Sequence, residues 1–293
     1  MGRLSAISSA VALLLTLLPA GVSAAPAMWL VRDADTEIYL FGTMHVLTPD
    51  AAWRTPAYDA AYDRAQTVWF EADLTSADPP ALTDLVARYG VDPKRPLSAK
   101  LAHRELRALK PLLQRGRVPL ARIEHMRPWA AALMLSTRAL DQGGGTVANG
   151  ADLTVTRQAK QAAKTVRTFE TVEDQVRMFA GLSEPGELQY LTDVIRERSA
   201  PARRGEPSLQ DAWIAGDIQR LGPALVGDMR RASPEFYDML LRRRNLAWAE
   251  TLEREITAPG GVHLVNVGAL HMVGDDGLLT LLAARGYEVR RIQ

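Results

Sequence analysis

Two histidines occupy the same position in two similar stretches, one near each end of the chain. His45 lies three residues after the glycine that ends the run 38–42, and His271 lies three residues after the glycine that ends the run 263–268. Such mainly apolar runs are typical of strands, and we expect each glycine to permit a backbone turn that other residues avoid. An imidazole just beyond a strand can transfer protons or bind a metal ion. Because 226 positions separate the two histidines (271 minus 45), they meet only if their strands are neighbours.

A carboxylate follows a third apolar run: Glu71 comes directly after 67–70. In an open α/β sheet, ligands gather beyond the carboxyl ends of the strands, so we expect His45, Glu71 and His271 to meet there. Two imidazoles and a carboxylate suit Zn²⁺, Mn²⁺ or Co²⁺ and leave positions for water and substrate. Such an ion lowers the pKa of water from near 16 towards about 7, which gives a nucleophile for attack on a carbonyl.

A second carboxylate would be needed to take and return the proton, and Asp73 and Glu170 are the candidates because both follow expected strands. Other interpretations stay open. A Gly-x-x-His motif is a weak signal, since such histidines are often hydrogen-bonded loop residues. Glu71 could instead form a structural salt bridge, and Asp73 lies in an Asp-x-Thr-Ser sequence that is common in loops.

The remaining chemistry-bearing residues favour structural roles. His103 and His125 lie in arginine-rich helical sequence and are expected at the surface. His263 lies at the entry to an expected strand, where a structural role is expected. We find no serine nucleophile elbow, no phosphate loop, no His-Glu-x-x-His motif and no cysteine. With 35 basic and 34 acidic residues, the charge gives no case for binding nucleic acid or an anionic membrane.

The first 24 residues have the pattern of an export signal. Arg3 precedes the apolar stretch 10–18, and the small residues 22–24 resemble a cleavage site. We therefore expect a signal peptide over 1–24 and a single α/β domain over 25–293, located in the bacterial periplasm or secreted. The apolar stretch is too short for a comfortable membrane span and no second one follows, so we expect no span after the signal is removed.

The elements that must position the candidate residues alternate at the two ends of the chain, around a mainly helical middle. We expect a central mixed sheet formed by N- and C-terminal strands and wrapped by helices, an α/β fold. Asp152 and Asp276 are expected to cap helices, and Thr171 with Asp174 resembles a capping box. The other expected elements are a hairpin over 27–31 and 37–42, strands over 67–70, 164–169, 263–268 and 287–292, and helices over much of 81–140, 208–256 and 278–285.

An ordered set of motifs resembles the TraB/GumN family, which includes the animal Tiki metalloproteases. The resemblance spans essentially the whole chain after the signal. It rests on the two Gly-x-x-His motifs, on Glu71 in Trp-Phe-Glu-Ala-Asp, on Gly150-Ala151-Asp152, on residues 169–175, on Arg244-Asn245-Leu246-Ala247-Trp248, and on the sequence that follows His271.

The resemblance implies a metal-dependent hydrolase with both motif histidines and Glu71 at its site, and a fold like that of erythromycin esterase and the haem-binding ChaN proteins. In Tiki-type members the activity is peptide cleavage supported by Mn²⁺ or Co²⁺. Arg244 and Asn245 carry over as possible site residues, the first to stabilise an oxyanion or bind a substrate carboxylate, the second to donate a hydrogen bond. A pair on a helix surface is the alternative.

Two functions of different classes follow. The first is an exported metallohydrolase that cuts peptide or protein substrates. The second is a binding protein that sequesters a peptide or haem without cutting it, although a pure binder would not need all three of His45, Glu71 and His271. A third possible function, in exopolysaccharide export, is suggested only by the name of the family.

Overall fold

A six-stranded mixed sheet forms the centre of the computed structural model, which describes residues 25–76, 79–141, 144–200, 208–258 and 260–293. The expected signal segment lies outside these described residues. The strand order is β4-β3-β5-β2-β1-β6. This confirms the predicted α/β fold with a mixed sheet built from both ends of the chain. The strands are β1 (Met28–Arg32), β2 (Thr36–Thr43), β3 (Thr67–Phe70), β4 (Thr165–Thr168), β5 (Gly261–Gly268) and β6 (Val289–Arg291).

Four neighbouring strands run parallel, because β2 pairs with β5, β5 with β3, and β3 with β4 in that sense. The hairpin predicted at the start of the chain is confirmed: β1 runs antiparallel to β2, and β6 antiparallel to β1. The Asp33 side chain closes the hairpin turn by accepting the backbone N–H groups of Asp35 and Thr36. The parallel strands all end at one edge of the sheet, where the candidate residues follow them.

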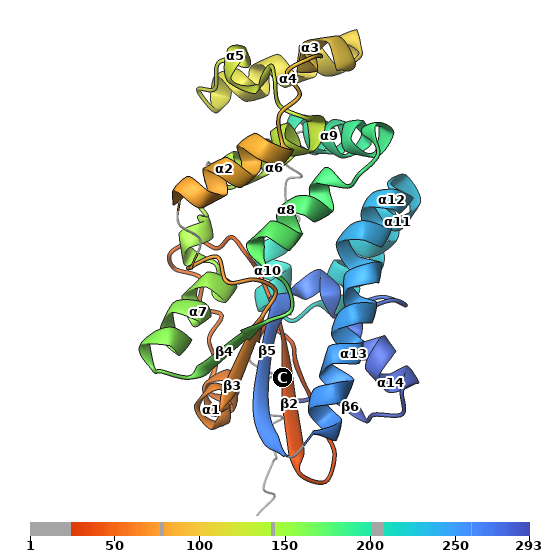
Figure 1. Ribbon diagram of the computed structural model, residues 1–293. Coiled ribbons are helices and arrows are strands. Elements are labelled where there is room, and N and C mark those ends of the chain that lie inside the picture. Colours follow the sequence, from red (N-terminus) through yellow and green to blue (C-terminus); the bar gives the residue numbers. More distant parts are fainter. Residues whose placement is uncertain (1–24, 77–78, 142–143, 201–207, 259) are drawn as a thin grey trace, which may run out of the picture.

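Helices cover both faces of the sheet, which explains why its central strands are apolar on both sides. On one face, α1 (Pro56–Arg64) and α7 (Ala151–Gln161) pack through Tyr58 and Val155 against the sheet. On the other, α13 (Arg243–Thr257) and α14 (Leu278–Ala284) pack through Trp248 and Leu282. Figure 1 shows these two layers on opposite sides of the strands.

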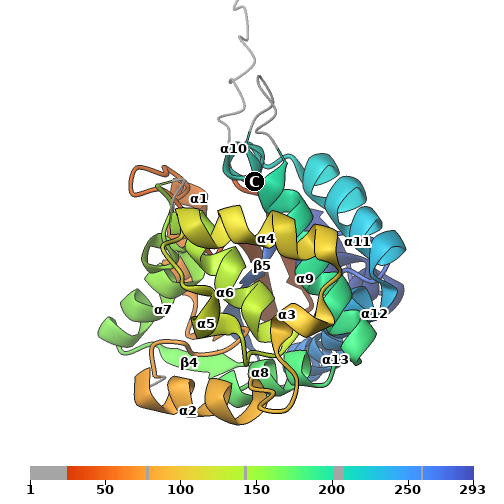
Figure 2. The same cartoon turned by 90° about the horizontal axis from the view of Figure 1, so that it is seen from above.

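The helical middle of the chain lies beyond the carboxyl edge of the sheet (Figures 1 and 2). Buried apolar clusters join its helices to each other, with α4 packed on α9 and α6 on α8. Within the described residues, no helix has the length and apolar character needed to cross a membrane. Besides α7, the helical elements between β3 and α13 are α2 (Pro79–Tyr89), α3 (Leu97–Lys100), α4 (His103–Arg115), α5 (Leu120–Ile123), α6 (Pro128–Asp141), η1 (Val147–Asn149), α8 (Val172–Ala180), α9 (Glu184–Ser199), α10 (Leu209–Ile214), η2 (Arg220–Val226), α11 (Gly227–Ala232), α12 (Pro234–Tyr237) and the π-helical turn η3 (Asp238–Arg242).

The predicted helix caps are confirmed in one case and wrong in two. Thr171 and Asp174 form the expected reciprocal capping box at the start of α8. Gly150, not Asp152, is the N-cap of α7, and Gly277, not Asp276, is the N-cap of α14. Both aspartates are engaged elsewhere, because Asp152 contacts His45 and Asp276 accepts the hydroxyl of Tyr237 at 2.6 Å.

Candidate functional site

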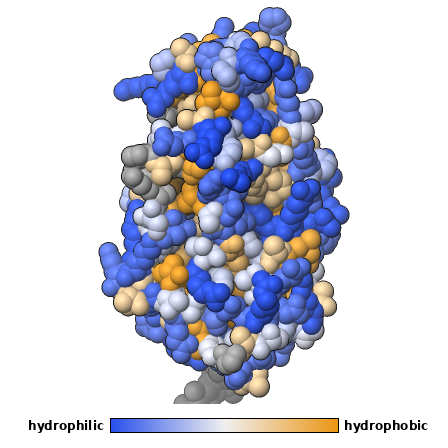
Figure 3. All heavy atoms as spheres, viewed as in Figure 1, coloured by the Kyte–Doolittle hydropathy of each residue, from blue (hydrophilic) through white to orange (hydrophobic). Residues whose placement is uncertain are grey.

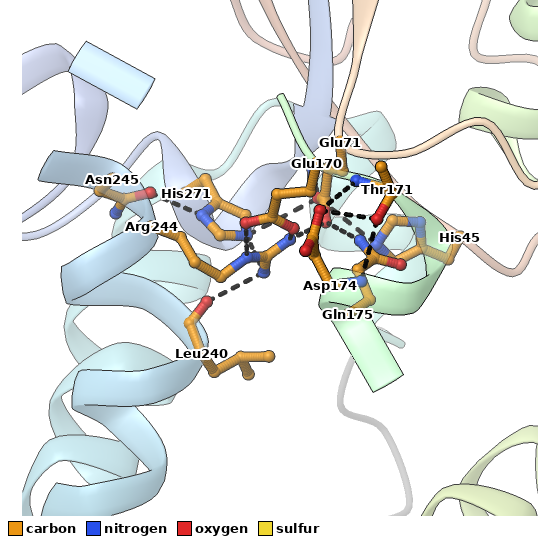
Figure 4. A network of polar contacts seen from close by, with 11 residues as sticks. His45, Glu71, Glu170, Thr171, Asp174, Gln175, Leu240, Arg244, Asn245 and His271 are labelled. Atoms are coloured by element: carbon orange, nitrogen blue, oxygen red, sulfur yellow. Dashed lines mark hydrogen bonds and ion pairs between the residues drawn. The ribbon is translucent and has the colours of Figure 1, made fainter. Parts of the chain in front are cut away.

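The three residues proposed from the sequence meet at the carboxyl edge of the sheet. β2 and β5 are direct parallel neighbours, with Thr43 opposite Gly268, so the two strands deliver His45 and His271 side by side. On the other side of β5, β3 runs parallel and ends immediately before Glu71. The 3₁₀ turn η4 (Ala269–His271) follows β5 directly. Figure 4 shows Glu71 between the two imidazoles.

The two motif glycines are required because a Cβ atom would be too close to neighbouring atoms, and not because the backbone adopts an unusual conformation. Gly268 has φ −50° and ψ 138°, which any residue can adopt, and neither Gly42 nor Gly268 has a positive φ. The expected unusual turn is therefore wrong. A Cβ at Gly42 would lie 2.9 Å from the Ala269 Cα, and one at Gly268 would lie 3.1 Å from Glu71 Oε1 and 3.3 Å from His45 Nε2. The glycines let the chain and the site side chains approach closely.

Both imidazoles turn the same ring nitrogen towards Glu71. The Oε1 atom of Glu71 lies 3.8 Å from Nε2 of His45 and 3.6 Å from Nε2 of His271. The backbone N–H of Gly268 donates to the same Oε1 at 2.7 Å and fixes its position. The space above Gly268 is thus surrounded by two imidazoles and one carboxylate.

The other ring nitrogen of each histidine is held from behind. Nδ1 of His45 lies 3.1 Å from Oδ2 of Asp152. Nδ1 of His271 lies 2.6 Å from Oδ1 of Asn245, whose Nδ2 donates to the Asp276 carbonyl at 2.8 Å. This second bond makes Oδ1 the acceptor, so His271 carries its proton on Nδ1 and presents the Nε2 lone pair to the site.

Arg244 links the centre to a second carboxylate. Its guanidinium donates to Oε2 of Glu71 at 2.7 Å and forms a two-pronged ion pair with Glu170, through Nε at 2.7 Å and Nη2 at 2.9 Å. Its Nη1 lies 3.1 Å from Nε2 of His271. The guanidinium also stacks over Trp248, and its side chain is only 8% exposed. Arg244 and Asn245 are therefore part of the constellation and not the surface pair that was the alternative.

The surroundings shift the pKa values of the two histidines in opposite directions. Burial, reinforced by the positive charge of Arg244, lowers the pKa of His271 to about 3. Desolvation opposes protonation of His45 as well, but the charge and hydrogen bond of Asp152, with Glu71, outweigh it and raise the pKa of His45 to about 9. Burial by itself would raise the pKa of Glu71, but His271, Arg244, His45 and the Gly268 N–H together hold it well below its ordinary value.

The two imidazoles and the carboxylate are donors of the type that binds a divalent metal ion. Two ligands about 2.1 Å from one tetrahedral ion lie roughly 3.4 Å apart, close to the Glu71–His45 and Glu71–His271 separations. Arg244 Nη1, however, already contacts the His271 lone pair that an ion would need. In keeping with this, the described part of the chain holds no group of three or more His, Cys, Asp or Glu side chains already arranged as a metal site. Binding of an ion requires this Arg244 contact to open and His45, whose pKa is raised, to lose the proton on its Nε2 atom.

The structure leaves Asp73 outside the site and adds Asp152 to it. Asp73 accepts hydrogen bonds from Thr75 and Ser76 in its own loop, as the alternative interpretation held, and pairs with Lys160 of α7. Asp152 was predicted only as a cap, and the motif Gly150-Ala151-Asp152 was the one signal that could have marked it. His263 accepts the Trp69 indole N–H at 3.2 Å, a structural role.

A model of the TraB/PrgY/gumN family matches residues 27–291 of the chain. The chain belongs to this family. All residues of the constellation fall inside the region that matches the TraB/PrgY/gumN family, so the relationship expected from the motifs is confirmed. The uncharacterized protein YbaP of Escherichia coli (strain K12) is 25% identical over 257 residues, which cover 88% of this chain and 92% of YbaP. YbaP of Shigella flexneri matches with the same figures. No solved structure gives a significant match.

Proposed function

We propose that this TraB/PrgY/gumN member is an exported hydrolase that depends on a divalent metal ion and cuts peptide bonds in a peptide or protein substrate. The observation that carries the proposal is the convergence of two Nε2 atoms on one oxygen of Glu71, with both Nδ1 atoms bonded behind them. A structural histidine has no need of this arrangement, whereas a metal ligand does. Export is supported by the signal pattern of residues 1–24.

His45, Glu71 and His271 are the proposed ligands, and Mn²⁺ or Co²⁺ is favoured over Zn²⁺ through the resemblance to Tiki-type members. When bound, such an ion polarises a carbonyl group and supplies a water with a pKa near about 7. Asp152 and Asn245 are proposed to keep the two rings turned towards the ion. Residues that hold ligands in this way typically change metal affinity by about 10- to 100-fold when they are lost.

Arg244 has a proposed role once its contact with His271 has opened. Its Nε and Nη2 atoms stay bonded to Glu170, which holds the guanidinium plane in place. The Nη1 atom keeps its hydrogen bond to the Leu240 carbonyl, and the N–H released from His271 can donate to a carbonyl oxygen that gains negative charge during the reaction. Of the two carboxylates considered for proton transfer, Glu170 and Asp73, only Glu170 lines the cleft beside the site.

Metal analysis of the purified protein beside His45→Ala and His271→Ala variants tests the ligand assignment. We expect wild-type protein to bind about one equivalent of Mn²⁺ or Co²⁺ and each variant to lose it, because removing one of three ligands leaves too few. Wild-type protein should also cut a mixed peptide pool when Mn²⁺ is added. His103→Ala, outside the constellation, serves as the matched control. Full metal content in both site variants would rule the assignment out.

A non-catalytic binding protein for a peptide or haem is the second candidate. The observation in its favour is the Arg244 contact with Nε2 of His271, which occupies the lone pair that a metal ion would need. This candidate predicts that Mn²⁺ causes no peptide turnover. Purified protein would instead carry a haem-like absorbance band or retain a peptide that elutes on unfolding.

A further inference from the structure

A cleft of about 460 Å³ opens beside the constellation, with Glu170 and Arg244 at one of its ends. A volume of this size lies within the range of ordinary ligand pockets. Leu182 and Glu235 lie at its other end, where the backbone N–H of Ser183 donates to Glu235 at 2.7 Å. The cleft therefore leads away from the site and ends at the start of α9.

Two helical stripes form the walls of the cleft. Asp174, Arg177, Met178 and Gly181 lie at positions i, i+3, i+4 and i+7 of α8 and of the turn that follows it, and so share one face. The opposite wall begins at Met239 in the π-helical turn η3. A π-helical turn has i→i+5 hydrogen bonds, so residues four and five positions apart lie on about the same side of it. Arg243 and Arg244, which follow the turn, therefore lie on the same side as Met239.

The two walls carry matching side chains, an inner methionine and an arginine at the rim. Met178 and Met239 are both half-buried; Met178 packs into none of the five apolar clusters of the described residues, whereas Met239 packs against the edge of the cluster that contains Trp129 and Val176. At the rim, Arg177 is paired with Glu173 at 2.8 Å and Arg243 with Asp238 at 2.5 Å. Figure 3 shows that apolar and hydrophilic patches are interspersed on the face of the molecule seen in Figure 1.

The charge and length of the cleft fit an extended peptide. The formal charges of the residues that line the cleft cancel, because the lining contains three acidic residues and three arginines. This balance argues against a polyanion as the ligand. The stretch of α8 from Asp174 to Gly181 is about 10 Å long, enough for about three residues of an extended chain. Methionine is a flexible side chain that adapts to apolar groups of different shapes.

We propose that this cleft binds the substrate chain on one side of the bond to be cut, and that Met178 and Met239 select a medium-sized or large apolar side chain such as Leu, Met or Phe. The proposal rests on the proposed function in one respect: it takes the end of the cleft at Glu170 and Arg244 as the place where the peptide bond is cut. Peptide binding between the two methionines does not require catalysis. The two proposals can therefore fail separately.

The test measures binding of short, end-blocked fluorescent peptides that differ at a single position, with a chelator present so that no peptide is cut. Peptides with Leu, Met or Phe at that position should bind within about threefold of one another. They should bind at least about tenfold tighter than peptides with Ser or Asp, because one buried apolar side chain contributes that much. Equal binding of all the peptides would overturn the proposal.

The double variant Met178→Gln, Met239→Gln keeps the shape of the walls but removes their apolar character, and should reduce the preference to about threefold or less. Met178→Leu with Met239→Leu should restore it. Met229→Gln, a half-buried methionine outside the cleft, is the matched control and should leave it unchanged. A preference that survives in the double variant would also overturn the proposal.

Turnover separates this result from the fate of the proposed function. Apolar preference without Mn²⁺-dependent cleavage by the wild-type protein would support the cleft and reject the hydrolase. Cleavage without any preference would support the hydrolase and reject this role of the cleft.

Discussion

His45 and His271 reach the same Glu71 through the same Gly-x-x-His motif, yet they lie in opposite surroundings. The His45 side chain is 54% exposed and is paired with the carboxylate of Asp152. The His271 side chain is 5% exposed, packs against Trp248 and is held by the neutral Asn245 beside the cationic Arg244. One ring is consequently biased towards the protonated form and the other towards the neutral form.

The Gly-x-x-His motif determines where each ring lies but not the charge that the ring carries. A glycine at or next to the end of a strand, followed by two further residues and then the histidine, places an imidazole at the edge of the sheet. The partner behind the ring comes from elsewhere in the chain: Asp152 from the start of α7 and Asn245 from α13. The motif therefore sets the position of each ring, and the helices that pack on the sheet set its charge.

The largest effect is expected on the His271 side, from Arg244→Ala. The substitution leaves Glu71 and Glu170 buried without their shared cation, which typically costs about 3–5 kcal/mol in the free energy of unfolding. Urea unfolding of the metal-free protein measures the loss. Arg243→Ala is the matched control, because that side chain is 76% exposed and should change the free energy of unfolding by less than about 1 kcal/mol. A loss below about 1 kcal/mol for Arg244→Ala as well would contradict the view of Arg244 as the link between the two carboxylates.

A smaller effect is expected from the two residues behind the rings, and it should be unequal. Asn245→Ala leaves the Nδ1–H of His271 and the Asp276 carbonyl without partners in a buried place, which typically costs about 1–3 kcal/mol. Asp152→Asn acts on a half-exposed ring and should cost less than about 1 kcal/mol. Chemical unfolding with a chelator present measures both. Equal losses would mean that the two rings are held alike.

The strands and the meeting of His45, Glu71 and His271 could be predicted from the sequence because each depends on local pattern and on one topological rule. The apolar runs before His45, Glu71 and His271 mark strands, and parallel strands end at one edge. Boundaries were less accurate: β4 covers Thr165–Thr168 instead of 164–169, and β6 covers Val289–Arg291 instead of 287–292. Strand ends depend on the ladder partner that is available, which one segment of sequence does not contain.

The contacts of Asp152 and Arg244 could not be predicted in the same way. An aspartate two residues after a glycine has the local features of a helix cap, and its use by His45 depends on the packing of α7 against the sheet. Arg244 lies 173 residues from Glu71 and 74 from Glu170, so no local pattern reports that one guanidinium joins both. The reason for a glycine at position 268 could not be predicted either: it is the close approach of side chains and not an unusual backbone turn. Those side chains come from three separate strand ends, which no local pattern reports.

The pH dependence of the metal-free protein should differ in sign between the two rings. The pKa of His45 is raised to about 9, so its contribution to stability is fully present below pH 6.5 and is lost as the pH rises through 9. The pKa of His271 is lowered to about 3, so the unfolded chain takes up its proton first, and the contribution of His271 is lost as the pH falls from 6.5 towards 3. NMR titration of the ring protons measures both values. In Asp152→Asn the His45 value should fall while the His271 value stays unchanged, and a joint shift would show that the rings titrate as one unit.

The smallest effect on stability is expected from Gly268→Ala, although this substitution acts on the point that both rings share. The backbone conformation at Gly268 suits alanine, so no strain arises there. The new methyl group would lie 3.1 Å from Glu71 Oε1 and 3.3 Å from His45 Nε2, and small shifts of these side chains can relieve such contacts. The lower chain entropy of alanine in the unfolded state offsets the remaining cost, so the free energy of unfolding should change by less than about 1 kcal/mol.

Metal binding should be strongly weakened by the same substitution. The methyl group of alanine would occupy the space that the three proposed ligands surround. We expect Gly268→Ala to lose at least about 100-fold in Mn²⁺ affinity, measured by calorimetry, while its urea midpoint stays close to that of the wild type. Gly286→Ala is the control for a glycine far from the site. It should leave the affinity unchanged and lower the stability, because Gly286 has φ +93° and a Cβ there is strained. If Gly268→Ala kept full affinity, the ion would have to bind away from Glu71 Oε1, and the two rings would share a carboxylate without sharing a metal.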